Sequence, residues 1–449
     1  MEVRWDLNIK NFANIGEAKI SISPLMCFVG DNNSGKSYVM SLLWGLLTIG
    51  KEVFPTKTTD RKSYKLCEEW LLSNINKEVK IDASVCDLYL SWFNDLLSAN
   101  IDKLLKKIFS YDVKIESAQI TNLQRKPMTL RWGKETSRYS VSSTYIQIPF
   151  KEAAELSKDE MLRMNCYICW NLIMHGIAAP LYTPIVKGRR TGEPVYLPAS
   201  RTGFMLTYKT LVNSSVNSTF ALHSDEQEDE ASYLTLPYID FIQLITQFET
   251  MGSTPIKNSA AVEIMKKNMI KGKLEIQKGY SPDIRYVPHN SEKKLPLYVT
   301  SSVITEVAAL LLLLTSNIKF KSIIIEEPEA HLHPALQKQM ARILILLANH
   351  DYPVWITTHS DTIIQHINNM VMLHNKPEET REKIASEYGY HKKDTISQKD
   401  VTLFQFKQNE NNKTEIEKLP CSEYGYIVPT FNDAIGAIVK EVYSVQDDD

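Results

Sequence analysis

Hydrophobic and polar residues alternate at the start of the chain. Apolar side chains recur at about every second position through residues 7–12 and again through 15–22. Such alternation is typical of half-buried strands, so these segments predict a β-hairpin with its turn at residues 14–16. A continuous apolar run over 25–29 then predicts a buried strand, and residues 38–47 have the apolar spacing of a helix.

The segment from about residue 51 to 187 has a different pattern. Its first part places leucines and tryptophans at helical spacing, and a further helical pattern covers 160–174. Between these two parts, residues 128–132 and 145–150 have the pattern of short strands. We therefore expect a mainly helical insertion that forms a second lobe.

The rest of the chain alternates between strand and helix patterns. Strands are predicted at 195–198, 283–287, 295–300, 322–327, 354–358 and 402–406. Helices are predicted at 238–251, 260–270, 334–348 and 432–442, with one further apolar helix that ends near residue 315. Alternation of this kind favours a parallel sheet covered by helices. The acidic segment 225–230 predicts a solvated loop.

The composition excludes a disordered or fibrous chain, because 43% of the 449 residues are hydrophobic. The formal net charge of −2 gives no basic signature, so any contact with nucleic acid is expected through a local patch or a partner. Charged residues at the very start argue against a signal peptide, and the strongest apolar run, 307–314, is too short to cross a bilayer. We expect a cytoplasmic chain without a membrane span.

The six cysteines are irregularly spaced, as is typical of reduced thiols. Cys166 and Cys169 form a C-x-x-C pair within a helical pattern, and no second pair stands at zinc spacing. We therefore favour a structural role for this pair over a metal or redox role. His331 and His333 form an H-x-H pair without a wider ligand cluster, so loop contacts at a subunit interface are favoured over a metal site.

A complete phosphate-binding motif joins the first buried strand to the helix that follows it. The run Gly30-Asp31-Asn32-Asn33-Ser34-Gly35-Lys36-Ser37 fits G-x-x-x-x-G-K-[ST], whose backbone N–H groups converge on an anion. Lys36 is expected to reach the β- and γ-phosphates, and the Ser37 hydroxyl is expected to bind Mg²⁺. The residues predicted to bind the nucleotide here are Gly30, Asn32, Asn33, Ser34, Gly35, Lys36 and Ser37.

Two later strands end in polar residues suited to phosphate chemistry. The aliphatic strand 322–327 ends in Glu326 and Glu327, at the end of a strand where ligands gather in α/β sheets. Adjacent strand residues point to opposite faces, so Glu326 fits the Walker B residue that holds Mg²⁺, and Glu327 fits the residue that polarises the attacking water. His359 follows the strand 354–358 and would hydrogen-bond the γ-phosphate or that water. A structural histidine is the alternative.

The order of these motifs resembles a known family. The chain is similar to the ABC-type ATPases of the OLD, RecF, SMC and Rad50 group in its P-loop, its long insertion, and the runs Glu326-Glu327-Pro328-Glu329-Ala330-His331-Leu332-His333-Pro334 and Thr357-Thr358-His359-Ser360. The first run is most similar to the OLD-like branch. The resemblance implies an α/β fold, an ABC-ATPase-like P-loop NTPase with a mixed sheet core, and ATP and Mg²⁺ as cofactors.

The same resemblance divides the chain into four parts. Residues 1–50 and 188–375 would form the ATPase domain, 51–187 the mainly helical insertion, and 376–449 an extension that completes the sheet. About 75 residues follow His374, which is too few for the TOPRIM nuclease that OLD-family members carry together with the last elements of the sheet. Any nuclease is therefore expected on a separate chain.

The resemblance also implies roles for residues outside the P-loop. Ser301 and Ser302 stand at the position of the ABC signature motif, where a helix start would cap the γ-phosphate of the opposite protomer. Val303 stands where many relatives have glycine, and the alternative for Ser302 is a plain helix N-cap. Arg201 ends the run Tyr196-Leu197-Pro198-Ala199-Ser200-Arg201 and is a candidate phosphate or interface contact.

A signature motif that acts on the opposite protomer implies that ATP lies between two chains, so a homodimer or higher homo-oligomer is expected. Stand-alone ATPases of this branch resemble the ATPase components of the anti-phage systems PARIS and Septu, which work with a separately encoded nuclease. The leading hypothesis is therefore a slow ATPase whose nucleotide-dependent assembly controls such an effector in bacterial anti-phage defence. The alternative is a RecF- or SMC-like DNA-repair ATPase that binds DNA directly. The similarity to the OLD-like branch disfavours a transporter subunit.

Overall fold

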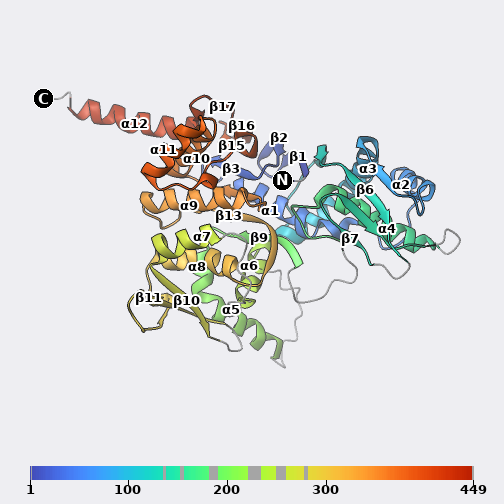
Figure 1. Cartoon of the computed structure of the whole chain (residues 1–449), viewed down its shortest axis with the longest axis horizontal. Coiled ribbons are helices and arrows are strands. Elements are labelled where there is room, and N and C mark those ends of the chain that lie inside the picture. The colour runs from blue at the N-terminus through green and yellow to red at the C-terminus, as the bar shows by residue number, and fades with distance from the viewer. Residues whose placement is uncertain are drawn as a thin grey trace.

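The chain folds around a large mixed β-sheet, as a computed structural model shows (Figure 1). The structure describes residues 1, 3–134, 138–151, 156–181, 191–220, 234–248, 259–277 and 282–446. The predicted acidic loop 225–230 lies outside these residues. Within the described part, the largest sheet has nine strands in the order β5-β1-β2-β16-β15-β3-β14-β13-β9.

Five neighbouring strands of this sheet run parallel to one another. They are β15 (Val401–Gln408), β3 (Leu25–Gly30), β14 (Val354–Thr357), β13 (Lys319–Glu326) and β9 (Thr191–Leu197). Parallel strands have their carboxyl ends at one edge of a sheet, so Gly30, Thr357 and Glu326 end three neighbouring strands at the same edge. The parallel sheet predicted from the alternating patterns is confirmed.

The other four strands of the sheet come mostly from the start of the chain. They are β1 (Val3–Phe12), β2 (Ile15–Ser21), β5 (Ser117–Arg125) and β16 (Thr414–Lys418). They pair antiparallel except where β2 meets β16 in parallel. The predicted hairpin of β1 and β2 is confirmed, but its turn is formed by residues 13–14, because Phe12 pairs with Ile15. β5 pairs with β1, so part of the segment assigned to the insertion belongs to the main sheet.

Helices cover both faces of the parallel strands. Phe28 of β3 lies in a core with residues of α1 (Lys36–Thr48) and α3 (Ala83–Phe109), whereas Cys27 lies in a second core with residues of α8 (Ser302–Thr315) and α9 (Pro334–Ala348). Strands buried on both faces have continuous apolar sequences, which explains the run over 25–29. The helix predicted at 334–348 is confirmed at both ends.

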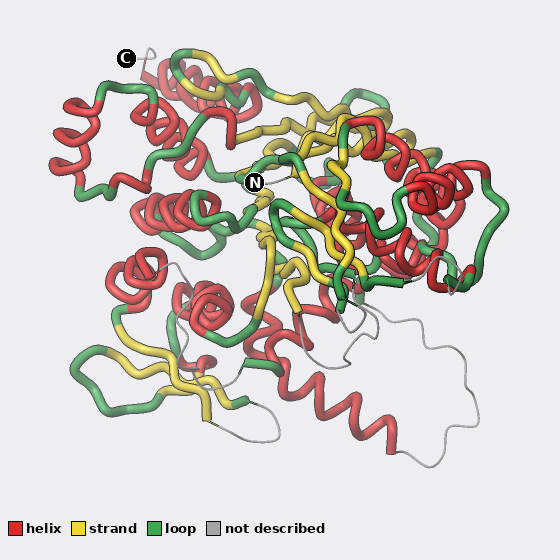
Figure 2. The backbone as a smooth tube through the Cα atoms, turned by 45° about the vertical axis from the view of Figure 1, so that its right-hand side comes forward, coloured by secondary structure: helices red, strands yellow, loops and turns green. Residues whose placement is uncertain are grey.

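The insertion forms a second lobe beside α1, at the right of Figure 1 and again at the right of the rotated view in Figure 2. Its described elements are α2 (Lys62–Ser73), β4 (Val79–Ile81), α3, β6 (Met128–Trp132), β7 (Ser140–Val141), β8 (Tyr145–Ile148) and α4 (Lys158–Met174). The long helix α3 packs against both α2 and α4. Its described elements are largely helical, with a small sheet in the order β4-β6-β8-β7.

A further group of elements packs around α8, α9 and the edge strand β9. The members of this group are α5 (Arg201–Phe220), α6 (Leu236–Thr246), α7 (Ser259–Ile264), the π-helix η3 (Met265–Ile270), β10 (Gly272–Gln277), β11 (Asp283–Pro288), β12 (Leu295–Pro296) and the 3₁₀ helix η4 (Leu297–Val299). The strand predicted over 295–300 is wrong beyond Pro296. Because proline has no N–H to donate to a ladder, the short strand ends there.

The last part of the chain completes the sheet and adds helices. Its other elements are α10 (Asp361–His374), α11 (Glu378–Tyr388), β17 (Cys421–Ser422), β18 (Gly425–Tyr426) and α12 (Pro429–Gln446). α12 covers the helix predicted at 432–442 and extends away from the body in Figure 1. Among the helices that the structure describes, none has the length and apolar character needed to cross a membrane.

Candidate functional site

The phosphate-binding motif forms the turn between β3 and α1. Three of its residues have left-handed backbone angles, with φ of 128° at Gly30, 58° at Asn33 and 90° at Gly35. Glycine adopts such angles at little cost. At Gly30 the need is also steric, because a Cβ would lie 2.0 Å from the carbonyl oxygen of Phe406 on β15. The loop is therefore shaped partly by a strand from the far end of the sequence.

Lys36 lies inside this loop. Its Nζ donates to the carbonyl oxygens of Gly30 at 3.0 Å and Asp31 at 2.6 Å. Burial lowers the pKa of Lys36 to about 8, and the negative charges of Glu327 and Asp31 oppose that shift. A polyphosphate beside the ammonium would compensate for its desolvation and favour its charged form. The lysine is therefore placed for electrostatic binding of an anion.

A cavity of about 640 Å³ opens in front of the loop. It is lined by Ala13, Asn14, Asn32, Asn33, Ser34, Gly35, Lys36, Ser37, Tyr38, Glu327, Thr357 and His359. The structure thus brings six of the predicted P-loop residues together with the two predicted catalytic residues. Among the described residues, the lining does not include Gly30, Arg201, Ser301, Ser302 or Glu326.

Glu327 reaches this cavity through an unusual backbone conformation. Its φ is 43°, in the left-handed region that side-chain-bearing residues rarely occupy. Its N–H donates to the carbonyl oxygen of Thr357 at 2.9 Å, which extends the pairing between β13 and β14 by one residue. Strained backbone of this kind costs roughly 1–3 kcal/mol and persists where neighbouring contacts hold it. The contact with β14 holds the carboxylate-bearing residue at the cavity wall.

Glu326 lies behind the cavity wall and is 1% exposed. Its Oε2 accepts a hydrogen bond from the Ala199 N–H at 3.1 Å, and its Oε1 is buried without a hydrogen-bond partner among the described residues. An orphaned carboxylate oxygen fits a role toward a hydrated cation, because Mg²⁺ keeps several waters and takes few protein ligands. Ser37 lines the cavity itself, so both predicted Mg²⁺ residues fit that ion.

No larger cluster of metal ligands is present in the described ranges. Within them, no group of three or more His, Cys, Asp or Glu residues is arranged to hold a metal ion. Cys166 and Cys169 are buried in α4, as the structural interpretation of the C-x-x-C pair requires.

His359 is tied to a carboxylate that the sequence analysis did not single out. The His359 N–H donates to Oε1 of Glu329 at 2.6 Å, and Oε2 of Glu329 is buried without a hydrogen-bond partner in the part of the chain that the structure describes. Desolvation and the nearby Lys36 ammonium lower the pKa of His359, which favours its neutral form. Burial raises the pKa of Glu329. Glu329 therefore fixes the position of the histidine loop.

Arg201 does not occupy the place expected of a phosphate contact. It is 2% exposed, and its guanidinium donates to the carbonyl oxygens of Glu326 at 2.5 Å and Glu327 at 2.9 Å. It also forms an ion pair with Glu306 of α8. These contacts turn its donors toward the protein, so Arg201 supports the end of β13 from behind. A direct contact with the nucleotide of its own chain does not fit this geometry.

Ser301 and Ser302 lie at the exposed start of α8. Ser301, rather than Ser302, occupies the N-cap position, and its side chain makes no capping hydrogen bond within the described part of the chain. The plain N-cap interpretation of Ser302 therefore does not hold. Both serines lie outside the cavity of their own chain.

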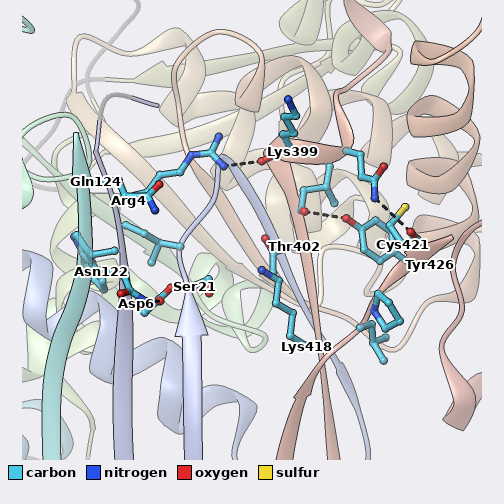
Figure 3. A pocket seen from close by; sticks show the side chains of 16 residues that line it. Arg4, Asp6, Ser21, Asn122, Gln124, Lys399, Thr402, Lys418, Cys421 and Tyr426 are labelled. Atoms are coloured by element: carbon cyan, nitrogen blue, oxygen red, sulfur yellow. Dashed lines mark hydrogen bonds between the residues drawn. The ribbon is translucent and has the colours of Figure 1, made fainter. Parts of the chain in front are cut away.

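A second cavity, of about 580 Å³, lies at the opposite edge of the sheet (Figure 3). β2 and β16 pair only at Ile15 and Thr414, so the sheet opens between them toward this edge. Arg4 lies across the opening and donates to the carbonyl oxygen of Lys399 at 2.6 Å. This cavity contains none of the residues predicted from the sequence, and its lining is drawn from many separate strands.

Comparison with known proteins agrees with this geometry. The model of the AAA ATPase domain family (AAA_15) matches residues 5–160 and 207–364. No curated protein gives a significant match.

The solved structures that match include heads of SMC proteins. An SMC head domain from Thermotoga maritima is 10% identical, with a TM-score of 0.35 over 94% of this chain and 100% of that chain. An Smc head with an extended coiled coil, bound to the C-terminal domain of ScpA and derived from Pyrococcus furiosus, is 11% identical, with a TM-score of 0.37 over 99% of this chain and 100% of that chain.

The family match carries the assignment. It covers well over half of the chain and includes both the P-loop and the strand that ends in Glu326. The cavity in front of the loop agrees with a P-loop ATPase. The chain belongs to the AAA ATPase domain family.

Proposed function

We propose that this chain binds and hydrolyses ATP in a site that a second copy completes, and that the resulting assembly is its output. One observation carries the proposal. The P-loop, Glu327 and His359 line a single cavity, while Ser301 and Ser302 lie outside it at an exposed helix start. Free N–H groups and hydroxyls at a helix start attract an anion, so they suit the γ-phosphate held by another chain.

The chemistry follows from the positions of the side chains. The loop N–H groups and Lys36 bind the phosphates, and Ser37 with Glu326 would hold Mg²⁺, which neutralises phosphate charge when bound. Glu327 accepts a proton from the water that attacks the γ-phosphate. His359, held by Glu329, donates a hydrogen bond toward the γ-phosphate oxygens. Loss of that phosphate removes the contacts to Ser301 and Ser302 and weakens the assembly.

Mixing two inactive variants tests whether the site is shared. Lys36→Ala removes the P-loop half of the site, and Ser302→Arg blocks the signature half. Neither variant alone is expected to hydrolyse ATP at a significant rate. An equal mixture should recover about a quarter of wild-type activity, because half of the random dimers contain one intact shared site. Full activity of Ser302→Arg alone would show that the site is complete within one chain.

Tyr38 is placed to support the nucleotide base. The residue is 40% exposed and lines the cavity, and its ring stacks on Phe109 of the insertion with centroids 5.1 Å apart and planes 22° apart. Stacking of an aromatic ring on a base is worth about 1–3 kcal/mol, so Tyr38→Ala should weaken ATP binding by roughly 5- to 150-fold. Tyr38→Phe should bind normally. Calorimetry with inorganic tripolyphosphate separates a loss of base stacking from a loss of phosphate binding. This ligand has no base, so Tyr38→Ala should bind it as wild type does.

The partner of the assembly is proposed to be a separately encoded effector nuclease in anti-phage defence. The E-E-P-E-A-H-L-H-P run supports this proposal through its resemblance to the OLD-like branch, and the net charge of −2 does not favour solo binding to DNA. Co-expression with the neighbouring gene should give a complex that Lys36→Ala disrupts. If no complex forms and the purified chain binds duplex DNA in an ATP-dependent, salt-sensitive manner, the DNA-repair alternative replaces this proposal.

A further inference from the structure

A buried ion pair lies behind the end of β13 and reaches α8. Arg201, at the start of α5, pairs with Glu306 of α8, and their side chains are 3% and 0% exposed. The hydroxyl of Thr202 donates to the same carboxylate at 2.5 Å. An ion pair this deeply buried has a desolvation cost that the attraction between its two charges does not always offset.

The same guanidinium holds the end of β13, the strand that ends in Glu326. It bonds to the carbonyl oxygens of Glu326 and Glu327, and the neighbouring Ala199 N–H bonds to the Glu326 carboxylate. Both backbone and side chain at this strand end are therefore fixed by the segment that leads into α5. Any shift of the Glu327 carbonyl must move Arg201 or break a hydrogen bond to it.

Glu306 connects Arg201 to α8, the helix at whose start Ser301 and Ser302 lie. It lies four residues after Ser302, one turn along α8, and the helix is rigid because most of it is buried in the second core. Direct contacts therefore run from Glu327 through Arg201 to Glu306, and the backbone of α8 connects Glu306 to the exposed serines. The planar guanidinium suits this task, since it bonds to a carboxylate and to carbonyl oxygens at once.

We propose that Arg201 and Glu306 are positioning residues that couple the nucleotide in one chain's own P-loop to the orientation of that chain's α8. The inference rests on the proposed function, in which Ser301 and Ser302 contact the γ-phosphate held by a second copy. Coupling of this kind makes the two ATP sites of a dimer interdependent, because each copy presents its serines according to its own nucleotide.

The test removes the pair without leaving a buried charge. The double variant Arg201→Met/Glu306→Leu keeps the volume of both side chains, and such replacements of buried pairs are often neutral for stability. The matched control is Arg342→Met/Asp394→Leu, which removes another buried pair, 8% and 0% exposed, away from the cavity. Arg201→Lys keeps the positive charge but cannot bond to the carboxylate and both carbonyl oxygens at once. This variant replaces the double variant in the test if the double variant does not fold.

Two measurements decide the outcome. Amide hydrogen exchange over residues 301–306, measured at protein concentrations too low for dimerisation, should differ between ATP and ADP in wild type and in the control, but not in the Arg201 variants. The ratio of dimer dissociation constants in ADP and ATP should fall by about tenfold in the Arg201 variants, with ATP affinity unchanged. If the Arg201 variants have a lower melting temperature but keep both the exchange difference and the ratio of dissociation constants, the ion pair has only a structural role. Failure of wild type to dimerise with ATP would instead reject the proposed function, and the exchange measurement would still test the coupling.

Discussion

Replacing Lys36 with alanine is expected to abolish ATP binding. The Lys36 ammonium lies within the loop that would surround the phosphates. The negative charge of the phosphates would offset the free-energy cost of desolvating this ammonium. Hydrogen bonds to charged groups contribute about 1.5–3 kcal/mol each, and Lys36 can make more than one of them, so the affinity should fall by more than about 100-fold. Calorimetric titration with ATP measures the loss.

The control for this prediction is another lysine of the chain. Lys51 pairs with Glu193 at 2.9 Å and does not line the cavity. Lys51→Ala should therefore bind ATP as wild type does, while Lys36→Ala should not. Normal ATP affinity in Lys36→Ala would mean that the nucleotide does not bind at this loop, and the whole assignment of the site would fail with it.

The parts of the fold that could be predicted are those with local signals. Local residues mark where two of these elements begin and end. They are the strand in the continuous apolar run over 25–29 and the helix at 334–348, which begins at Pro334. β5 was not predicted, because only Ala118 and Ile120 are buried in a strand that otherwise reads as polar. Its place in the main sheet depends on pairing with β1, about a hundred residues earlier, and such pairing leaves no local pattern.

The same distinction applies to the candidate site. Glu327 and His359 could be proposed because each follows an apolar strand at the edge where ligands gather. The role of Glu329 depends on an N–H group thirty residues away, and the placement of Arg201 depends on Glu306, which follows it by more than a hundred residues. A motif can therefore indicate which residues matter, whereas their partners are visible only in the folded chain.

Replacing Glu327 with glutamine should separate ATP binding from hydrolysis. Glutamine keeps the size of the side chain and its hydrogen bonding but cannot accept a proton from the attacking water. The loss of a general base lowers turnover by a factor of about 10² to 10⁴. ATP should remain bound, because the phosphate contacts of the P-loop are untouched, and the shared site should then hold two copies together.

The decisive measurement combines turnover with assembly state. Size-exclusion chromatography with light scattering should show Glu327→Gln as a stable dimer in ATP and a monomer in ADP, while phosphate release falls to near background. Glu193→Gln is the matched control, since Glu193 pairs with Lys51 outside the cavity, and it should behave as wild type. Unchanged hydrolysis in Glu327→Gln would show that another group activates the water. Glu329 would then be the first to test, because its buried carboxylate has a raised pKa and one oxygen without a hydrogen bond among the described residues.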